Sequence, residues 1–545
     1  MASHPTESQH FSNGSPKGPP SEQKRIARAA GVVGFWTVLS RILGFVRDMV
    51  IALFLGAGSG ADAFFVAFRI PNLLRRLFAE GALSAAFVPT YVETLQKNGL
   101  DDAAKLARVA FTLTAIVLAA ITAAGILFSP SIVHLFAPGF VKDPELFSLT
   151  VDLNRLMFPY IFFVSLVALV SGVLNSMGYF AAPAAAPVVL NACMITSVAV
   201  LCSFFNMPAN YALAWGVIAA GFAQLLLQLP FLTRAGIRLR ADFEFRSPAL
   251  KRIGKLFVPA AISGAVYQVN VLIGTILASL LQRGAVSWLY YADRLVELPL
   301  GIFAIALGTA VLPSMSRLAG KGNMIGLRKS VSYSLRLIAF FTIPASVGLI
   351  ILPVPIISIL FQRGLFSYED TLETAYALIC YTVGLWAFSG LKIVLQAFFA
   401  LKDTKTPLWV SLGAVFVNLC LGVILMRYMA QGGLALATAL AASFNLSILF
   451  VILIRRLGGF PLKEFTVSLL KITVASLLMG IPLIYFRNLG DWELGLTLSN
   501  LLILGGCISG GVAVFAVFAC VLRCPELKSL LGMIRGMGQG RSGAK

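Results

Sequence analysis

Apolar stretches recur along almost the whole length of this 545-residue chain, and many are long enough to cross a membrane. A helix needs about 20 apolar residues to cross a hydrocarbon core roughly 30 Å thick. Hydrophobic residues make up 58% of the chain and charged residues only 12%, whereas soluble proteins average about 45–50% and about 25%. The sequence therefore predicts an all-α polytopic membrane protein.

About fourteen spans can be placed on these stretches. If the N-terminus is cytoplasmic, an even number of spans puts both termini in the cytoplasm. We predict spans near residues 31–56, 61–95, 104–129, 150–177, 184–205, 211–234, 255–281, 285–317, 329–352, 374–400, 407–428, 432–454, 465–486 and 497–522.

The formal charge of +20 is distributed unevenly between the segments that join these spans. In this orientation most Lys and Arg residues fall in inward segments, above all in the linker at 235–254 and in the C-terminal tail. This bias is the positive-inside pattern of multi-pass proteins, so the charge does not require nucleic acid as a partner. We expect a multi-pass protein of the cytoplasmic (inner) membrane.

The chain ends and the scarcity of metal ligands limit other interpretations. Residues 1–24, rich in Ser, Pro and Gly, predict a disordered cytoplasmic tail, and residues 525–545 are expected to be a cytoplasmic tail. The apolar segment after the first tail is too long for a signal peptide. The seven cysteines lie mostly within spans and the chain has three histidines, so we expect no disulfide framework, no metal site and no cofactor.

Two parts of the chain resemble each other. ALSAAFVPT (82–90) aligns with ALGTAVLPS (306–314), which places Pro89 over Pro313, and residues 172–191 align loosely with 393–418. Spans 1–6 and 7–12 are therefore predicted to be two copies of a six-helix lobe, related by a pseudo-two-fold axis along the membrane normal. Two such lobes that face each other predict a central cleft.

This repeat divides the chain into lobes and connecting segments. The hairpin formed by the last two spans lies outside the repeat and, from its residues alone, is expected to be a peripheral stabilising element. We predict an N-lobe at 25–234, a basic cytoplasmic linker at 235–254, a C-lobe at 255–460 and the hairpin at 461–524.

Charged residues occur inside spans 1, 2 and 8, where lipid does not solvate them. A charged side chain near mid-membrane costs about 2.5–3.5 kcal/mol, so several arginines are tolerated only beside protein or a water-filled cavity. The residues are Arg41, Arg47, Asp48, Asp62, Arg69, Arg75, Arg76, Glu80, Asp293, Arg294 and Glu297.

Helical spacing places part of this set on one face of span 2. Arg69, Asn72 and Arg76 share that face with Glu80, while Arg75 lies about 100° around the helix from Arg76. We expect one of these two arginines to face the cleft and the other to pair with Glu80.

Two interpretations of these charges remain open. Some of them can be internal ion pairs that hold helices together. The arginines also outnumber the nearby carboxylates, and surplus guanidinium in a cleft favours a phosphate or carboxylate ligand, so we also expect a polyanionic ligand. The candidate ion pairs are Arg76–Glu80, Arg47–Asp48 and Asp152–Arg155.

Three runs carry a resemblance to a known family. SRILGFVRDMVIALFLGAGSGADAFFVAFRIPNLLRRLFAEGALSAAFVPTY (40–91), GAVSWLYYADRLVELPLGIFAIALGTAVLPSMS (284–316) and ILFQRGLF (359–366) resemble the MurJ/MviN family, and the resemblance extends over residues 25–525. These are bacterial lipid II flippases of the MOP exporter superfamily, which also contains MATE drug exporters. The resemblance implies that lipid II, an undecaprenyl-pyrophosphate disaccharide-pentapeptide, is moved to the outer leaflet for peptidoglycan synthesis. We expect a monomer surrounded by membrane lipids.

The family's cavity residues carry over onto matching positions. The resemblance implies that the arginines bind the pyrophosphate and that the hairpin at 461–524 forms a groove for the polyprenyl tail, which goes beyond a stabilising role. Some relatives hold sodium among carboxylates of the second lobe, but spans 255–281 and 407–428 contain no Asp or Glu, so we expect no such site. The implied substrate-binding residues are Ser40, Arg41, Arg47, Asp62, Arg75, Ser287, Arg294 and Glu297, with Arg76, Glu80 and Asp48 as structural or portal charges.

We expect alternating access between the lobes, driven by the membrane potential, because one charge moved through 100 mV gains about 2.3 kcal/mol and no Walker A motif is present. A flippase for another undecaprenyl-pyrophosphate-linked glycan remains an alternative. A MATE-like ion-coupled exporter is a second, although an arginine-rich cleft disfavours cations. An enzyme acting on polyprenyl phosphates would need a large catalytic loop or clustered acids and histidines, which the chain lacks, so we expect no enzyme.

Overall fold

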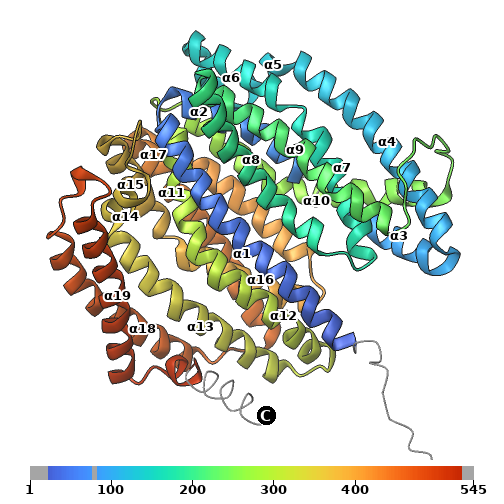
Figure 1. The fold of residues 1–545 in the computed structure, drawn as a ribbon. Helices are drawn as coiled ribbons and strands as arrows, with labels where there is room; N and C mark the ends of the chain where they lie inside the picture. The colour runs from blue at the N-terminus through green and yellow to red at the C-terminus, as the bar shows by residue number, and fades with distance from the viewer. Residues whose placement is uncertain (1–21, 77–82, 531–545) are drawn as a thin grey trace, which may run out of the picture.

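Every regular element in the described part of the chain is a helix. The computed structural model describes residues 22–76 and 83–530. Its long helices form a bundle in which α1 (Glu22–Leu55) crosses the middle of the view in Figure 1. The predicted all-α architecture is confirmed. Most of both predicted tails, and Glu80, lie outside the described residues.

Two lobes of similar helix order follow each other along the chain. The N-lobe contains α1, α2 (Ser59–Arg75), α3 (Ser84–Asn98), α4 (Leu100–Leu127), α5 (Ser129–Phe136), η2 (Pro138–Lys142), α6 (Pro144–Met157), α7 (Tyr160–Ser176), α8 (Ala181–Phe205) and α9 (Ala209–Arg234). The C-lobe contains α10 (Pro248–Ser279), α11 (Ala285–Pro299), η3 (Leu300–Ala304), α12 (Ile305–Gly320), α13 (Met324–Ile351), α14 (Pro353–Phe361), α15 (Tyr368–Thr382), α16 (Leu385–Ala400) and α17 (Lys405–Leu457).

The repeat predicted from sequence recurs in the details of these helices. In each lobe a 28-residue helix, α4 or α13, is followed by a short helix, α5 or α14, and then by a span broken near its middle. The two broken spans are α6–α7 and α15–α16. Pro89 and Pro313, which align in sequence, lie inside α3 and α12 at corresponding places.

Several predicted spans are interrupted, which the apolar pattern did not reveal. The span expected at 150–177 breaks before Pro159, which has no backbone N–H to continue the helix. The span expected at 374–400 bends by 42° between α15 and α16. The span expected at 285–317 contains a π-helical segment, η3, directly after Pro299. Hydropathy measures length and polarity only, so it cannot locate these breaks.

The spans predicted at 407–428 and 432–454 are confirmed as helical. They lie within α17, which consists of two helices that fold back on each other, since Asn445 donates to Ser411, 34 positions earlier, at 3.3 Å. Its only non-helical backbone is at Ala430, where φ is 44° and ψ is −126°. A left-handed φ is unfavourable for alanine, so packing on both sides must hold this bend. A Cβ at Gly433, three residues later, would collide with the Leu425 carbonyl oxygen, so this position requires glycine.

Three predicted boundaries fall inside helices. Helix α1 begins at Glu22, and α10 begins at Pro248 within the predicted linker. Residues 525–530, predicted as part of a tail, are helical. The Glu526 side chain there is 1% exposed and accepts a 2.7 Å hydrogen bond from Ser468, so this segment is packed and not a free tail.

The last two long helices form a hairpin outside the two lobes. Helices α18 (Leu462–Arg487) and α19 (Leu498–Val521) lie beside α13 at the edge of the bundle in Figure 1. Ile472, Met479 and Leu483 of α18 are buried in one apolar cluster with Phe340 of α13. The hairpin is therefore joined to the C-lobe through an apolar interface.

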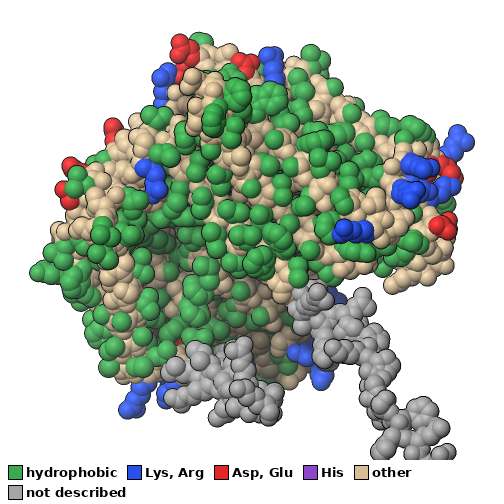
Figure 2. Space-filling view, in the orientation of Figure 1, with side chains coloured by type: hydrophobic (Ala, Val, Ile, Leu, Met, Phe, Trp, Pro, Cys, Tyr) green, Lys and Arg blue, Asp and Glu red, His purple; other side chains and the backbone are tan. Residues whose placement is uncertain are grey.

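The surface of the bundle is that of a membrane protein. Hydrophobic side chains cover most of the face shown in Figure 2, and charged side chains gather toward its ends. Within the described residues nine helices are long and apolar enough to cross a membrane, or ten if α15 and α16 form one span. The chain is therefore a multi-pass membrane protein, and the count of fourteen spans stays a prediction.

The two lobes are fastened together at one end, called here the sealed end (residues 53–62, 139–143, 279–287 and 363–366). Leu365 donates its backbone N–H to the Leu53 carbonyl at 3.1 Å, and Arg283 lies 2.5 Å from Asp143. The Tyr291 hydroxyl donates to the Gly56 carbonyl at 3.1 Å. Backbone and charged contacts thus close this end across the lobe boundary.

The opposite end, called here the linker end (residues 93–108 and 235–252), has a different set of contacts. Arg252 pairs with Glu93 at 2.5 Å, and Lys105 pairs with Glu244 at 2.5 Å. Ile253 of α10 is buried in a cluster made of N-lobe helices. These contacts tie the linker and the start of α10 to the N-lobe.

Candidate functional site

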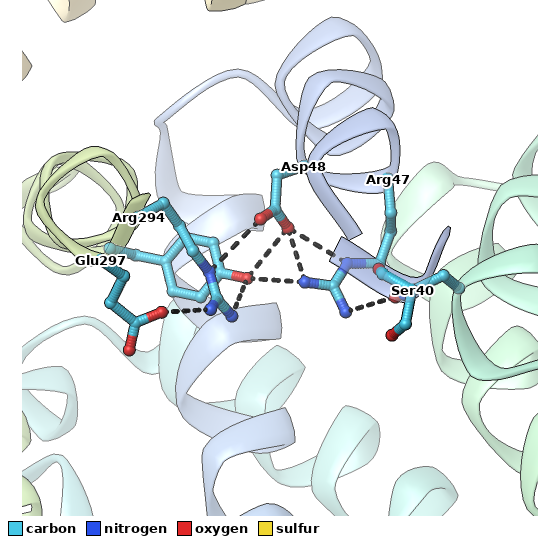
Figure 3. Close-up of polar contacts among 7 residues, drawn as sticks. Ser40, Arg47, Asp48, Arg294 and Glu297 are labelled. Carbon is cyan, nitrogen blue, oxygen red and sulfur yellow. Dashed lines mark hydrogen bonds and ion pairs between the residues drawn. The ribbon is translucent and has the colours of Figure 1, made fainter. Parts of the chain in front are cut away.

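The Asp48 carboxylate lies at the centre of a polar cluster that joins the two lobes inside the membrane region (Figure 3). Its Oδ1 atom accepts hydrogen bonds from Arg47 Nη2 at 2.7 Å and from the Tyr290 hydroxyl at 3.0 Å. Its Oδ2 atom lies 3.3 Å from Nε of Arg294. Asp48 comes from α1 and its two C-lobe partners come from α11, so one buried carboxylate links the lobes.

Arg47 is held by neighbours on three sides. In addition to Asp48 it donates to Asn191 Oδ1 at 3.1 Å and to the Tyr290 hydroxyl at 3.2 Å. Asn191 in turn donates from Nδ2 to the Ser40 carbonyl at 3.1 Å. Because Arg47 is only 7% exposed and its nitrogens are engaged, it acts in this conformation as the internal partner of Asp48.

Arg294 and Glu297 lie on the open side of the cluster. Arg294 donates from Nη1 to Glu297 at 2.9 Å and from Nη2 to the Tyr290 hydroxyl at 3.0 Å, and its guanidinium lies 4.8 Å from the Tyr290 ring centroid. The exposed fraction of the side chain rises from 2% at Asp48 to 32% at Arg294 and 51% at Glu297. The cluster therefore presents one guanidinium and one carboxylate to an approaching molecule.

Arg41 lies near the middle of α1, about two helical turns before Asp48. A Cβ at Gly301 in η3 would lie 2.2 Å from Nη1 of Arg41, so the guanidinium rests against the bare glycine backbone. π-Helical segments often occur at functional sites. Gly301 lets this exposed arginine sit directly on the segment that follows Pro299.

Gly301→Ala is expected to displace the Arg41 guanidinium without unfolding the protein, because the atom struck is the end of a flexible side chain. We expect affinity for lipid II, the ligand that the resemblance implies, to fall about tenfold, as for one weakened charge-assisted hydrogen bond. Native mass spectrometry of the purified protein with that lipid would measure this. The Gly301→Ala effect should vanish in an Arg41→Ala background, and additive losses would show that Gly301 acts by another route.

Asp62 and Ser287 contact each other. Asp62 accepts hydrogen bonds from the Gly284 N–H at 2.6 Å and from the N–H and hydroxyl of Ser287 at 2.9 and 2.6 Å. This carboxylate thus caps the N-terminus of α11, where the helix dipole favours negative charge. Both side chains are at most 1% exposed. In this conformation they close the sealed end, and their contact with a substrate stays a prediction.

The two arginines at the end of α2 differ in their surroundings. Arg75 donates to Asn72 Oδ1 at 3.0 Å and is half-buried, whereas Arg76 is exposed. The predicted pairing with Glu80 lies outside the described residues. The other two predicted ion pairs are present: Arg47–Asp48 at 2.7 Å, and Arg155–Asp152 at 3.7 Å on the exposed surface.

Sequence reasoning did not assign Tyr290 and Asn191 to the site. Tyr290 lies one helical turn before Arg294 in the run YYADR, and Asn191 is an isolated polar residue in an apolar span. A polar side chain inside a span marks a functional or inter-helix contact, and that signal was available. The partner across the lobe boundary was not, because it depends on how α1, α8 and α11 pack.

The arrangement suits binding of an anion. Among the described residues no group of three His, Cys, Asp or Glu side chains is placed to hold a metal ion. The open side of the cluster carries the Arg294 guanidinium beside Glu297, and Arg41 rests on Gly301, four residues after Glu297. Guanidinium binds phosphate oxygens through paired hydrogen bonds.

Comparison with solved structures identifies the fold. A structure described as an inward-facing conformation of a multidrug resistance MATE family transporter of the MOP superfamily matches 77% of this chain and 94% of its own, with a TM-score of 0.64 and 17% identity. At that identity the likeness shows the fold alone. The chain has the fold of a MOP-superfamily membrane transporter.

The sequence comparisons identify the family. The family profile described as lipid II flippase MurJ matches residues 51–503. The probable lipid II flippase MurJ of Rhizobium tropici is 38% identical over 512 residues, which are 92% of this chain and 95% of that protein. The one from Vibrio cholerae is 37% identical over 438 residues, 78% of this chain and 82% of that protein. This chain belongs to the lipid II flippase MurJ family, which confirms the resemblance seen in its motifs.

A solved structure of that family agrees in fold over almost the whole chain. It is described as lipid II flippase MurJ in an inward closed conformation, and it matches 90% of this chain and 98% of its own with a TM-score of 0.74 and 28% identity. The arrangement of two lobes and a hairpin is therefore shared with a structure of the family.

Proposed function

We propose that this protein flips lipid II from the inner to the outer leaflet of the cytoplasmic membrane for peptidoglycan synthesis, acting as a transporter and not as an enzyme. The observation that carries the proposal is the inter-lobe cluster around Asp48, with Arg294 of the C-lobe on its open side. Family membership supports lipid II over other polyprenyl-linked glycans as the substrate.

In this proposal the cluster binds the pyrophosphate of the substrate between the two lobes. Arg294 contributes a guanidinium from the C-lobe, while Arg41 contributes one from the N-lobe. A pyrophosphate bound between them would replace Glu297 as the partner of Arg294 and would bridge the two lobes. Asp48 and Arg47, already paired, hold Tyr290 and Arg294 in position. Ser40, whose carbonyl accepts a hydrogen bond from Asn191, and Arg75 are assigned to the same proposed site.

The linker end is the cytoplasmic end in this proposal, and both termini are cytoplasmic. The basic linker fits the positive-inside rule in that orientation. The contacts at the sealed end then close the path to the outer leaflet, while the site is reached from the cytoplasm. The polyprenyl tail stays in lipid along the hairpin α18–α19. The protein works as a monomer, without nucleic acid or a bound cofactor.

The membrane potential supplies the driving force in this proposal. Two exported phosphate charges would gain roughly 4–5 kcal/mol per 100 mV if the unloaded protein returns without charge movement. The two lobes would then rock about the bound head group. The sealed end opens as the linker end closes, and water competing for the phosphate at the outer side weakens the grip of the arginines.

Flipping in proteoliposomes tests this function directly. We expect lipid II to reach an impermeant head-group reagent at least about tenfold faster with an inside-negative potential than after its collapse by an ionophore. Vesicles with the Arg294→Ala protein serve as the control. Rates equal to those of protein-free vesicles would overturn the flippase assignment, whereas flipping unaffected by the potential would overturn only the coupling.

A further inference from the structure

The C-lobe contains a polar cavity inside the membrane region that the proposed flipping mechanism does not use. It has a volume of about 180 Å³ and lies between α10, α11, α15 and α17. Its polar lining side chains are Asn270, Asn418, Thr438, Tyr381, Asp293 and, from the N-lobe, Arg69.

This cavity repeats part of the Arg47 site in the second lobe. In the N-lobe, Asn191 of α8 bonds to residue 47 of α1, 144 positions earlier. In the C-lobe, Asn418 of α17 donates to Asn270 of α10, 148 positions earlier, at 2.9 Å. Both lobes therefore have an asparagine at this place, Asn191 and Asn418. The partner of Asn191 is the cation Arg47, whereas the partner of Asn418 is the neutral Asn270. The C-lobe cavity therefore lacks a cation of its own at this place.

Arg69 supplies a cation from the other lobe. It extends from α2 and donates from Nη1 to the Thr275 hydroxyl at 2.8 Å, and Thr275 is fully buried in α10. Asp293, on the same cavity wall, provides the negative charge. One arginine and one carboxylate leave the described lining neutral overall.

This lining does not fit a free metal cation. Asp293 is the one carboxylate among the described lining residues, and Arg69 already places a positive charge beside it. A bound sodium ion would have to share the cavity with the Arg69 guanidinium, and like charges at short range repel each other. The residues thus disagree with the sodium site that some relatives carry in this lobe.

We infer that the cavity is a receptor for the Arg69 guanidinium, which takes the place of a free cation and fastens the N-lobe to the C-lobe in the sealed conformation. Because Arg69 reaches the cavity from the opposite lobe, separation of the lobes withdraws it from Thr275. Closure of the sealed end is then independent of monovalent metal ions.

Chemical accessibility of the sealed end tests this inference without lipid II. A failure of the inference can therefore be distinguished from a failure of the flippase assignment. Ala57 is buried at the lobe boundary beside Gly284, and Ala57→Cys would react with an impermeant maleimide only when this end opens. Mass spectrometry of the labelled peptide separates this cysteine from the native ones. With Arg69 intact, we expect equal labelling in sodium and in choline chloride.

Arg69→Ala in the same background is expected to raise the labelling rate about tenfold, and millimolar guanidinium should bring it back. Arg69→Lys keeps a cation and should stay within about threefold of the parent, which controls for misfolding. Arg155→Ala, which removes an exposed arginine paired within α6, should change nothing. Sodium-dependent labelling of the parent, unchanged labelling of Arg69→Ala, or rescue of that variant by sodium in place of guanidinium would each overturn the inference.

Discussion

Flipping of lipid II is expected to fall at least about a hundredfold in Arg294→Ala, and deletion of the Glu297 carboxylate in the same chain should not restore it. Arg294 comes from the C-lobe, and its side chain, 32% exposed, lies on the open side of the cluster. Two charge-assisted hydrogen bonds to a pyrophosphate contribute about 1.5–3 kcal/mol each, so their loss accounts for a decrease of this size. The assay is head-group accessibility in proteoliposomes.

Arg47 provides the contrast that makes this prediction specific. Arg47→Ala leaves the buried Asp48 carboxylate with one charged partner at 3.3 Å, and breaking a buried ion pair costs about 3–5 kcal/mol. We therefore expect poor folding and little flipping from the single variant, but substantial recovery of both in Arg47→Ala with Asp48→Ala. If Arg47 itself bound the phosphate, the double variant would fold and remain inactive.

Recovery of flipping when Glu297 is removed from the Arg294→Ala protein would contradict the prediction. It would mean that Arg294 serves only to neutralise Glu297, and the pyrophosphate would have to bind elsewhere. Arg294→Lys is the matched control, because it keeps the charge and loses the paired hydrogen-bond geometry. We expect its flipping rate to lie between those of the parent and Arg294→Ala.

Asp62→Asn is expected to open the sealed end and to reduce flipping at least about tenfold. The carboxylate accepts three hydrogen bonds at the N-terminus of α11, and an amide can offer only one accepting atom. Loss of one charge-assisted bond costs on the order of 2 kcal/mol, which shifts the equilibrium between sealed and open conformations roughly thirtyfold. Maleimide labelling of Ala57→Cys measures that shift independently of transport.

Ser287→Ala is the graded control for Asp62. It removes the hydroxyl bond and keeps both backbone N–H bonds to the carboxylate, so we expect a smaller increase in labelling than for Asp62→Asn. Asp62→Asn with unchanged labelling but lost flipping would contradict the role at the sealed end. It would instead favour the direct contact with substrate that the family resemblance implies.

The sequence by itself determined the class of protein, the two-lobe repeat and the set of charged residues from which the site is drawn. These follow from local physics. A helix satisfies its backbone hydrogen bonds within one segment, so apolar length predicts where the helices lie, and each predicted span is helical over most of its described part. The cost of a charge in lipid made the arginines of α1, α2 and α11 conspicuous.

Only the tertiary structure decided which of those charges meet. Spacing fixes the face of a helix on which a side chain lies, but not the direction in which that face points within the bundle. Asp62 and Ser287 are 225 positions apart, and Arg69 and Thr275 are 206 apart. Packing of helices from different lobes made Asp62 a helix cap and Arg69 the cation of a distant cavity. A buried charge requires a partner, but only the packing determines which one.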